Sequence, residues 1–517
     1  MLRKCARIAR SMGSSYRESN MSGFRTKHVL ITVITVLLII GLTRCSSSSK
    51  TGTETQNDVC GDGGGSSATA PPLPGLYPLN PGPAGTFFGI NTNDLGASWP
   101  ATGIPVTSWR SHGGGVKWAD INTGPGAYDF SRLDRWLSEA KTNNTDIMFT
   151  IFATPSWASS HGVNSSSPNP CCDFAKKNGP GTCDPPADLN CDGTGTNETF
   201  ISFVTALVQH AGPGTIKYWE LWNEPNVARE WNANADCANS GVEHPSQVML
   251  ARMAKDLKNT VIGFDPNAKF TTPAATAGSK AGDWLGLYLT STDGGNYADI
   301  NAFHGYINNS SGCPSDCPIA EAVGDQIDHL NALLPASAQG KPLFDTEGFW
   351  GDAKNPDGSR TTAITDPDQQ ASFVVRYYLI QMWKRVAKFY WWTWDISNQS
   401  AFYNSSSNLL TAPGNAYVRV VQWTNGGAAT VGPCGTDPSV ATLWTCTIHS
   451  ASGAVSEAIW DTSQTCSSGT CTTTNVNLSS LNPPFSFNAY LDLSGNVTAI
   501  SNQSVPVGLK PILMVKQ

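Results

Sequence analysis

Strand-like and helix-like runs alternate along this chain from residue 86 to residue 423. Eight short runs, rich in β-branched and aromatic residues, are typical of buried strands, and most precede a segment with apolar residues at helical spacing. The strand-like runs are 87–91, 105–110, 146–155, 216–223, 268–274, 299–306, 341–350 and 388–395. The helix-like segments are 130–140, 198–211, 247–263, 282–290, 319–334, 368–386 and 415–423. This alternation predicts an α/β fold, a (β/α)8 TIM barrel with parallel strands inside a ring of helices.

A doubly wound open sheet also alternates strands with helices, but no glycine-rich phosphate loop follows the first strand-like run. The barrel is therefore favoured, over residues 81–426. After residue 427 the pattern changes to short strand-like runs separated by Gly, Ser and Asn turns, such as WTCTI, EAIWD and NAYLDL. This predicts an appended C-terminal β-sandwich over 427–517. A structural module packed on the barrel is favoured over a separate carbohydrate-binding role.

The first 45 residues are typical of an export segment. A basic start is followed by the apolar run Val29–Leu42, which has the length of a signal-peptide core rather than of a membrane-spanning helix. The run leads to Cys45 and resembles a bacterial lipoprotein signal, in which Cys45 would be lipidated, although Arg44 departs from that pattern. An uncleaved anchor and ordinary secretion remain alternatives, and all three place the body outside the cytoplasm, at the cell surface or secreted. Residues 46–80 are predicted to form a flexible Ser/Gly/Pro-rich tether.

Cysteine content and charge agree with export. The chain has 14 Cys, and disulfides are the default state of cysteines in an exported protein. Spacing suggests the pairs Cys313–Cys317, Cys434–Cys446 and Cys466–Cys471. The partners of the remaining cysteines stay open: Cys60, Cys171, Cys172, Cys183, Cys191 and Cys237. A zinc knuckle is not favoured, because no second Cys pair stands at metal-site spacing. The net charge of −7 gives no basic surface for nucleic acid.

Two glutamates stand at the ends of predicted strands. Glu224 closes IKYWELWNEPN at the end of the fourth strand-like run, and Glu347 lies in LFDTEGFW at the end of the seventh. The carboxyl ends of barrel strands meet at one rim, so these side chains are expected to lie together. Hydrolysis of a glycosidic bond needs one carboxylic acid to protonate the leaving oxygen and a second carboxylate to attack or to activate water. Two solvated loop carboxylates are the alternative.

The residues around these glutamates resemble a known group of enzymes. WNEPN and TEGFW resemble the two signatures of the clan of retaining glycoside hydrolases built on (β/α)8 barrels. The run Trp109-Arg110-Ser111-His112, the run TPSWA at 154–158 and the terminal sandwich are most similar to the β-xylosidase/α-L-iduronidase family (glycoside hydrolase family 39-like) and related bacterial polysaccharide hydrolases. The resemblance covers residues 85–517. It implies a double-displacement mechanism in which Glu224 is the acid/base and Glu347 is the nucleophile.

The resemblance also implies substrate-binding roles at neighbouring positions: Asn223, Arg110, His112, His304, Tyr306, Trp394 and Trp157. Asn223 would bind the sugar 2-hydroxyl, His304 and Tyr306 would position the nucleophile or the sugar, and Trp394 would form the floor under the sugar. Arg110 would keep Glu347 ionised, since a nearby cation lowers a carboxylate pKa. Arg110 and His112 could instead be a buried structural pair. The residue pattern further predicts that Glu220 pairs with an inward-facing barrel cation and that Asp345 is structural.

The predicted chemistry needs no cofactor. A structural calcium ion is one possibility at Asp188, Asn190 and Asp192, because Asp188–Gly193 matches the first half of a calcium loop. The closing Glu should fall at Thr199, and Glu198 comes one residue early, so an ordinary polar loop is the alternative. We expect a monomer whose partner is a carbohydrate and whose only membrane contact is the N-terminal anchor. A catalytically silent glycan-binding barrel is the competing function, and the sequence predicts neither the sugar nor exo or endo action.

Overall fold

The computed structural model describes residues 85–92, 104–162, 172, 175–276, 279–307, 319–354, 360–396, 399–482 and 484–516. Its largest sheet has eight parallel strands in the order β7-β6-β5-β2-β1-β12-β9-β8. The strands are β1 (Phe88–Asn91), β2 (Ser108–Arg110), β5 (Asp146–Ile151), β6 (Tyr218–Leu221), β7 (Lys269–Phe270), β8 (Asn301–His304), β9 (Leu343–Gly348) and β12 (Lys388–Trp391). Parallel bridges Thr271–Ile300 and Ala275–Phe303 join the two edge strands, so the sheet closes on itself. The predicted barrel is confirmed.

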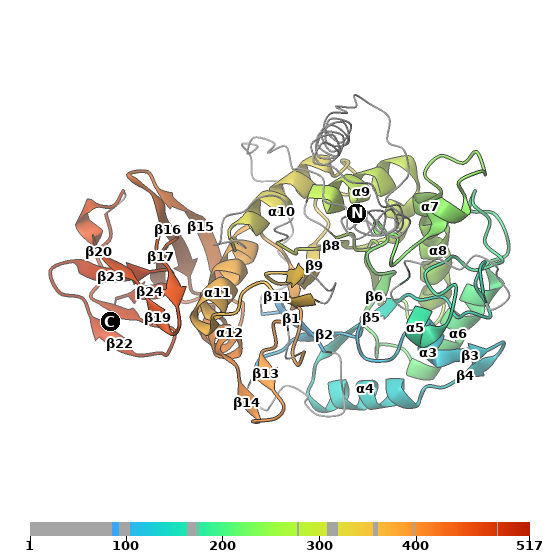
Figure 1. Cartoon of the computed structure of the whole chain (residues 1–517), viewed down its shortest axis with the longest axis horizontal. Coiled ribbons are helices and arrows are strands. Elements are labelled where there is room, and N and C mark those ends of the chain that lie inside the picture. Colours follow the sequence, from blue (N-terminus) through green and yellow to red (C-terminus); the bar gives the residue numbers. More distant parts are fainter. Residues whose placement is uncertain are drawn as a thin grey trace, which may run out of the picture. The chain divides into compact units, whose positions relative to one another are not determined.

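Helices surround these strands, as the ring of ribbons around the central arrows in Figure 1 shows. They are α4 (Ser131–Thr142), α6 (Glu198–Ala211), α8 (Pro245–Ile262), α9 (Ser279–Ser291), α10 (Ala322–Leu333), α11 (Pro367–Trp383) and α12 (Ala412–Trp423). Each packs through an apolar stripe, and α6 is typical, since its buried residues follow the spacing of one helix face. They are Phe200, Phe203, Val204, Leu207 and Val208.

The loops between these helices and strands contain several short helices and hairpins. The helical ones are α3 (Trp118–Ile121), α5 (Ala175–Asn178), α7 (Ala233–Asp236) and the 3₁₀ turn η1 (Gly294–Tyr297). The short hairpins are β3 (Asn122–Gly124) with β4 (Ala127–Tyr128), β10 (Asp352–Lys354) with β11 (Arg360–Thr362), and β13 (Tyr403–Asn404) with β14 (Leu409–Leu410). None of these was predicted, because runs of two to four residues carry no readable periodicity.

The C-terminal region forms an antiparallel sheet in the order β15-β16-β17-β24-β21-β22. These strands are β15 (Thr430–Asp437), β16 (Val440–His449), β17 (Val455–Asp461), β21 (Ala489–Leu491), β22 (Val497–Ala499) and β24 (Ile512–Val515). Beside it are the pairs β18 (Cys466–Ser467) with β19 (Thr470–Cys471) and β20 (Thr473–Asn477) with β23 (Ser504–Gly508), and the 3₁₀ turn η2 (Leu478–Ser480). Leu443, Ile459, Val505, Val507 and Met514 share one buried apolar cluster. This architecture agrees with the predicted β-sandwich.

Helix α11 is buried over most of its length, since every residue from Ala371 to Gln381 is buried. A helix on the outside of a barrel normally keeps one face in water. Here the C-terminal region covers that face: Ser372 Oγ donates a hydrogen bond to Leu509 O (2.6 Å). On the neighbouring helical segment, Glu321 accepts a hydrogen bond from Trp460 Nε1 (2.7 Å). The C-terminal region is therefore packed against the barrel.

Four disulfides lie within the described residues. Cys434–Cys446 and Cys466–Cys471 confirm two of the pairs suggested by spacing. Cys172–Cys183 closes a turn within the loop that follows β5, and Cys191–Cys237 joins that loop to the loop after β6. Cys60, Cys171 and the predicted pair Cys313–Cys317 lie outside the described residues, as does the apolar run Val29–Leu42. Among the helices that are described, none has the length and apolar character to cross a bilayer.

Candidate active site

The barrel brings Glu224 and Glu347 to the same rim. Glu224 follows β6 and Glu347 lies in β9, so both side chains stand at the carboxyl ends of strands. One carboxylate oxygen of each, together with a ring nitrogen of His304, forms a group whose atoms all lie within 4.8 Å of one another. Both glutamates are buried. Two carboxylates this close repel each other when both are ionised, so each needs its own stabilising partners if both are to carry a charge.

The turn after β6 aims Glu224 into this group. Trp222 and Glu224 both have left-handed backbone conformations, with φ of 63° and 43°. Non-glycine residues adopt this region at a cost, and only surrounding contacts keep them there. The indole of Trp222 packs against Trp231 (4.3 Å between ring centroids) and donates a hydrogen bond to Glu230 O (2.9 Å). Glu224 N donates to Ala274 O (3.0 Å) beyond β7. The turn is thus anchored on both sides.

Arg110, at the end of β2, contacts several of the polar side chains of the site. It is completely buried and donates from Nε to Glu220 (2.7 Å), from Nη1 to Glu347 Oε2 (2.6 Å) and from Nη2 to Asn223 Oδ1 (2.9 Å). The planar fork of a guanidinium suits several acceptors at fixed angles. Burial lowers the pKa of Arg110, but the charges of Glu220 and Glu347 outweigh this and raise it. The predicted pairing of Glu220 with a barrel cation is confirmed.

Replacing Arg110 with methionine should lower the free energy of unfolding by about 3–5 kcal/mol, because Glu220 and Glu347 would be left buried without their counter-charge. Urea unfolding followed by tryptophan fluorescence measures this. Lys269→Met removes a cation from an exposed position and should change stability by no more than about 0.5 kcal/mol. Equal stability of the two variants would show that Arg110 does not hold the two carboxylates together.

Glu347 is held at both oxygens. Arg110 contacts Oε2, and the hydroxyl of Tyr306 donates a short hydrogen bond to Oε1. Burial and the negative charge of Glu347 raise the pKa of Tyr306 well above its usual value, so the phenol remains a donor. His112 Nδ1 lies 3.9 Å from Glu347 Oε2, and its ring stacks on Phe152. Burial, with the positive charge of Arg110, lowers the pKa of His112 well below its usual value, so this imidazole is neutral.

Glu224 is paired with His304 rather than with Arg110. His304 Nδ1 lies 2.9 Å from Glu224 Oε1, and Arg229 Nη2 lies 3.6 Å from Oε2. Burial would raise the pKa of Glu224, but the hydrogen bond and charge of His304, with the charge of Arg229, lower it to about 2. Burial lowers the pKa of His304, and the charges of Glu347 and Glu224 outweigh this and raise it. These directions favour the shared proton on His304 in the free site, whereas the acid/base role predicted for Glu224 starts with the proton on Glu224.

The aromatic residues are arranged differently from the prediction. The indole of Trp394 has 0% exposure and stacks on Tyr403, so no face of it is available as a floor for a sugar. Strand β12 ends at Trp391 rather than at residue 395, so Trp394 lies beyond the strand and not at its end. Trp392 is the partly exposed ring beside the site, edge-on to His112 at 5.5 Å. Trp157 is partly exposed and donates its indole N–H to Asn122 O (3.0 Å).

Sequence reasoning missed two polar residues of the site, Asn91 and Arg229. Asn91, the last residue of β1, accepts a hydrogen bond from Arg110 Nη1 (3.3 Å) and donates to Thr346 O and Tyr390 O (both 3.2 Å). Its place at a strand end on the rim was a usable signal. Arg229 lies in the loop after β6, and nothing in the sequence marks it.

In the loop predicted to bind calcium, polar side chains form hydrogen bonds within the loop and to the start of α6. Asp188 Oδ2 accepts hydrogen bonds from Thr199 N (3.0 Å) and Thr199 Oγ1 (3.1 Å) in the first turn of α6. Asn190 Nδ2 donates to Thr194 Oγ1 (3.0 Å), and Asp192 Oδ1 accepts from Thr194 N (3.0 Å). These bonds fix the turn and the start of the helix. A calcium ion at this loop stays a prediction.

Asp345 is buried beneath the site, next to Glu347 in β9. Its Oδ1 accepts hydrogen bonds from Gly305 N (2.9 Å) and Glu347 N (3.3 Å), and its Oδ2 contacts Tyr377 and Gln381. It therefore links the ends of β8 and β9, in agreement with the structural role predicted for it. Burial raises the pKa of Asp345 to about 7.

This pKa predicts a pH-dependent contribution to stability. The folded-state pKa of about 7 exceeds that of an unfolded aspartate, about 3.9, so the folded state binds the extra proton. The contribution is complete below about pH 4 and is lost as the pH rises toward 7, at up to about 1.4 kcal/mol per pH unit. Asp345→Asn should remove this slope from the free energy of unfolding, measured with urea between pH 4.5 and 8. Asp283→Asn, at an exposed carboxylate, should keep it, and identical slopes would contradict the prediction.

No protein-family model and no curated protein matches this sequence. Among solved structures, the chain is similar to a family 39 glycoside hydrolase from the gut symbiont Bacteroides cellulosilyticus WH2, with a TM-score of 0.51 and 13% identity over 80% of this chain and 76% of that one. It also aligns with CelM2, a bifunctional glucanase-xylanase from a metagenome library, with a TM-score of 0.49 and 13% identity over 85% and 98%. At such identity the likeness to the family 39 enzyme shows the fold alone, a (β/α)8 barrel with an appended β-domain.

Proposed function

We propose that this chain is a secreted or surface-anchored retaining glycoside hydrolase that cleaves O-glycosidic bonds in a poly- or oligosaccharide. The main support for this proposal is the pair Glu224 and Glu347 on the barrel rim, with carboxylate oxygens within 4.8 Å of each other. Retaining enzymes hold their two carboxyl groups about 5–5.5 Å apart, whereas inverting enzymes need about 6.5–9.5 Å to admit a water molecule. The short separation supports attack by a carboxylate rather than by water.

The first step uses Glu347 as the nucleophile. Its carboxylate oxygen forms a bond to the anomeric carbon while the bond from that carbon to the glycosidic oxygen breaks, and the leaving oxygen takes a proton from Glu224. Arg110 and Tyr306 hold Glu347 by one oxygen each and keep it from rotating. In the second step Glu224 accepts a proton from water, the water oxygen bonds to the anomeric carbon, and Glu347 leaves.

His304 supplies the proton that Glu224 delivers. His304 Nδ1 lies 2.9 Å from Glu224 Oε1, so transfer of a proton from a protonated imidazole gives a neutral imidazole and a carboxylic acid without rearrangement. A sugar over the site excludes water from Glu224, and removal of water favours the neutral acid. His304 thus acts as a positioning residue and proton store for Glu224. Asn223, held by Arg110, would bind the sugar 2-hydroxyl, and the partly exposed Trp392 would replace Trp394 as the sugar platform.

A panel of plant and bacterial polysaccharides and aryl glycosides, screened by reducing-sugar and chromophore release, tests the proposed activity. Proton NMR of the first product formed from the best substrate then gives its anomeric configuration. Retention is expected. Inversion would refute the double displacement but leave glycoside hydrolysis in place. Binding to a glycan with no cleavage across the panel would instead identify the chain as a catalytically silent glycan-binding barrel.

A further inference from the structure

A second cluster of titratable side chains lies in the loops that follow β5 and β6. His161 Nδ1 lies 3.1 Å from Asp236 Oδ1 and 3.8 Å from Asp184 Oδ2, and the three ligand-type atoms all lie within 4.8 Å of one another. Atoms bound to a tetrahedral zinc ion at about 2.0–2.2 Å stand about 3.3–3.6 Å apart. The distances of 3.1 and 3.8 Å lie on either side of this ligand-to-ligand separation, so one small cation could contact all three groups after only slight adjustment.

Asp184 gives an independent reason to expect a ligand here. Its side chain has 0% exposure, and no described residue makes a hydrogen bond of ordinary length and angle to either carboxylate oxygen, although the Asn232 amide lies near enough to lower its pKa. A buried carboxylate without such partners costs several kcal/mol unless a cation compensates it. Asp184 Oδ2 and Asp236 Oδ1 both face the same ring nitrogen of His161, so two carboxylates meet at one point. A divalent cation would remove the repulsion between these two carboxylates.

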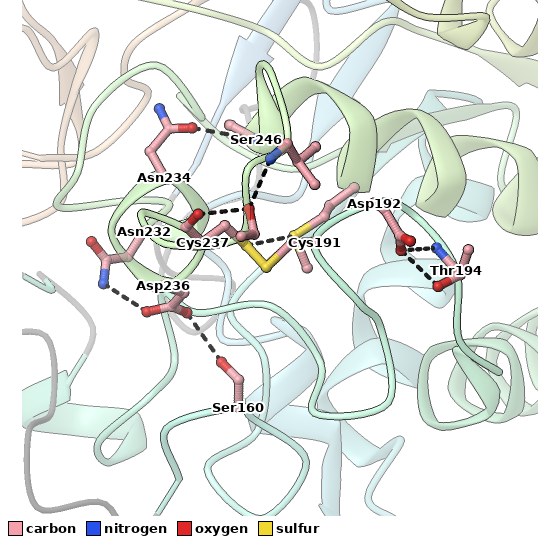
Figure 2. Close-up of a disulfide and its surroundings, with 12 residues drawn as sticks. Ser160, Cys191, Asp192, Thr194, Asn232, Asn234, Asp236, Cys237 and Ser246 are labelled. Atoms are coloured by element: carbon pink, nitrogen blue, oxygen red, sulfur yellow. Dashed lines mark hydrogen bonds between the residues drawn. A yellow bond between two sulfur atoms is a disulfide. The ribbon is translucent and has the colours of Figure 1, made fainter.

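The surroundings of the cluster resemble a supporting shell around a metal ligand. Figure 2 shows Asp236 between Ser160 and Asn232, next to the disulfide Cys191–Cys237. Ser160 Oγ donates to Asp236 Oδ2 (3.1 Å) and Asn232 Nδ2 donates to Asp236 Oδ1 (3.4 Å). Such outer hydrogen bonds orient ligating carboxylates in metal sites. The side chain of His161 is 35% exposed, which leaves one side of the cluster open to solvent for entry of the ion and for a water ligand.

We propose that His161, Asp184 and Asp236 bind a divalent transition-metal cation of the zinc class. A set of one imidazole nitrogen and two carboxylate oxygens favours zinc, which binds nitrogen and oxygen ligands together. Calcium and magnesium prefer oxygen ligands alone. The ion would fasten the loop after β5 to the loop after β6, beside the disulfides Cys172–Cys183 and Cys191–Cys237. Its role would be structural, because it would hold two rim loops rather than the reacting groups.

Tag-free full-length protein from zinc-supplemented cells, desalted without chelator, provides the test. Elemental analysis should find one zinc per chain, and EDTA should lower the melting temperature, with zinc chloride restoring it. In calorimetric titrations of the stripped protein, His161→Gln and Asp236→Asn should weaken zinc binding by more than the roughly 10–100-fold that loss of an outer hydrogen-bond partner costs. His161 is partly exposed, so H161Q should fold even if substitution of the buried Asp184 does not.

Two matched variants assign the binding site. His329→Gln disrupts another His–Asp contact of 3.1 Å, but one with a single, exposed carboxylate, and should leave zinc affinity unchanged. Glu347→Gln alters the other group of ligand-type side chains and should also leave it unchanged. Absence of zinc-dependent heat in the unmodified protein would overturn the proposal. So would zinc binding that survives H161Q and D236N, or that disappears in E347Q. Calcium binding at the site in preference to zinc would overturn the assigned metal class.

Discussion

Replacing Glu347 with alanine should lower kcat by more than about 10⁴-fold on every substrate, because the covalent route is lost and only binding and proton donation remain. The loss should be similar for good and poor leaving groups, since neither can react without the nucleophile. Steady-state kinetics with an aryl glycoside and with the best natural substrate measure it. Azide should partly restore turnover of the aryl glycoside, because a small anion fits the space left by the carboxylate, and the product should have inverted configuration.

The matched control for this variant is Glu243→Ala, which removes a glutamate from an exposed position and should leave kcat unchanged. Circular dichroism should show both variants folded. Near-normal turnover by Glu347→Ala would mean that another group attacks the sugar, and the proposed roles of the two glutamates would have to be abandoned. Rescue by azide with retained configuration would exchange the roles of Glu347 and Glu224.

Glu224→Ala should give a loss that depends on the leaving group. Without the acid, cleavage of natural substrates should slow by about 10²–10⁴-fold, the usual contribution of general acid–base catalysis. A dinitrophenyl glycoside leaves without protonation, so its first step should proceed at nearly the normal rate and the glycosyl-enzyme should accumulate as a burst. Rapid-quench kinetics distinguish the two steps.

The pH profile of the same variant provides a second readout. In the unmodified enzyme the Glu224–His304 pair holds one proton, and kcat/KM should fall at high pH when the raised pKa of His304 is passed. This alkaline limb should disappear in Glu224→Ala with the dinitrophenyl glycoside. An equal slowing of all leaving groups, with the alkaline limb kept, would show that Glu224 is not the proton donor. His304→Gln in the otherwise unmodified chain should move the alkaline limb, because Glu224 then titrates without its partner.

The barrel and the positions of its two glutamates could be predicted because both depend on local patterns. Strand-like runs ending in Asn-Glu-Pro and Thr-Glu-Gly place a carboxylate at a strand end, and a closed parallel sheet puts all such ends on one rim. The disulfides Cys434–Cys446 and Cys466–Cys471 were predictable for a similar reason, since each bridges a short hairpin. The long-range bridge Cys191–Cys237 depends on how two loops fold and left no pattern in the sequence.

The electrostatics of the site could not be predicted, because they depend on which side chains face each other across the barrel. His304 could have contacted either glutamate, and its choice of Glu224 decides where the proton rests. Arg229 approaches Glu224 from an irregular loop. The error at Trp394 has a different origin: its role was implied by the family resemblance and by a strand expected to reach residue 395, whereas β12 ends at Trp391. The alternation of side chains predicts their direction only within a strand, and not for residues beyond its end.

Helix α11 has a consequence for how this protein can be divided. The boundary near residue 427 is clear in the sequence, but Ala371–Gln381 is shielded from water on the barrel side and on the side of the C-terminal strands. A chain cut after α12 would uncover buried residues of α11, leave Ser372 without its acceptor at Leu509 and remove Trp460, one of the hydrogen-bond partners of Glu321. Residues 85–516 are thus a single unit for expression, engineering and unfolding, and a catalytic fragment ending at α12 is expected to aggregate.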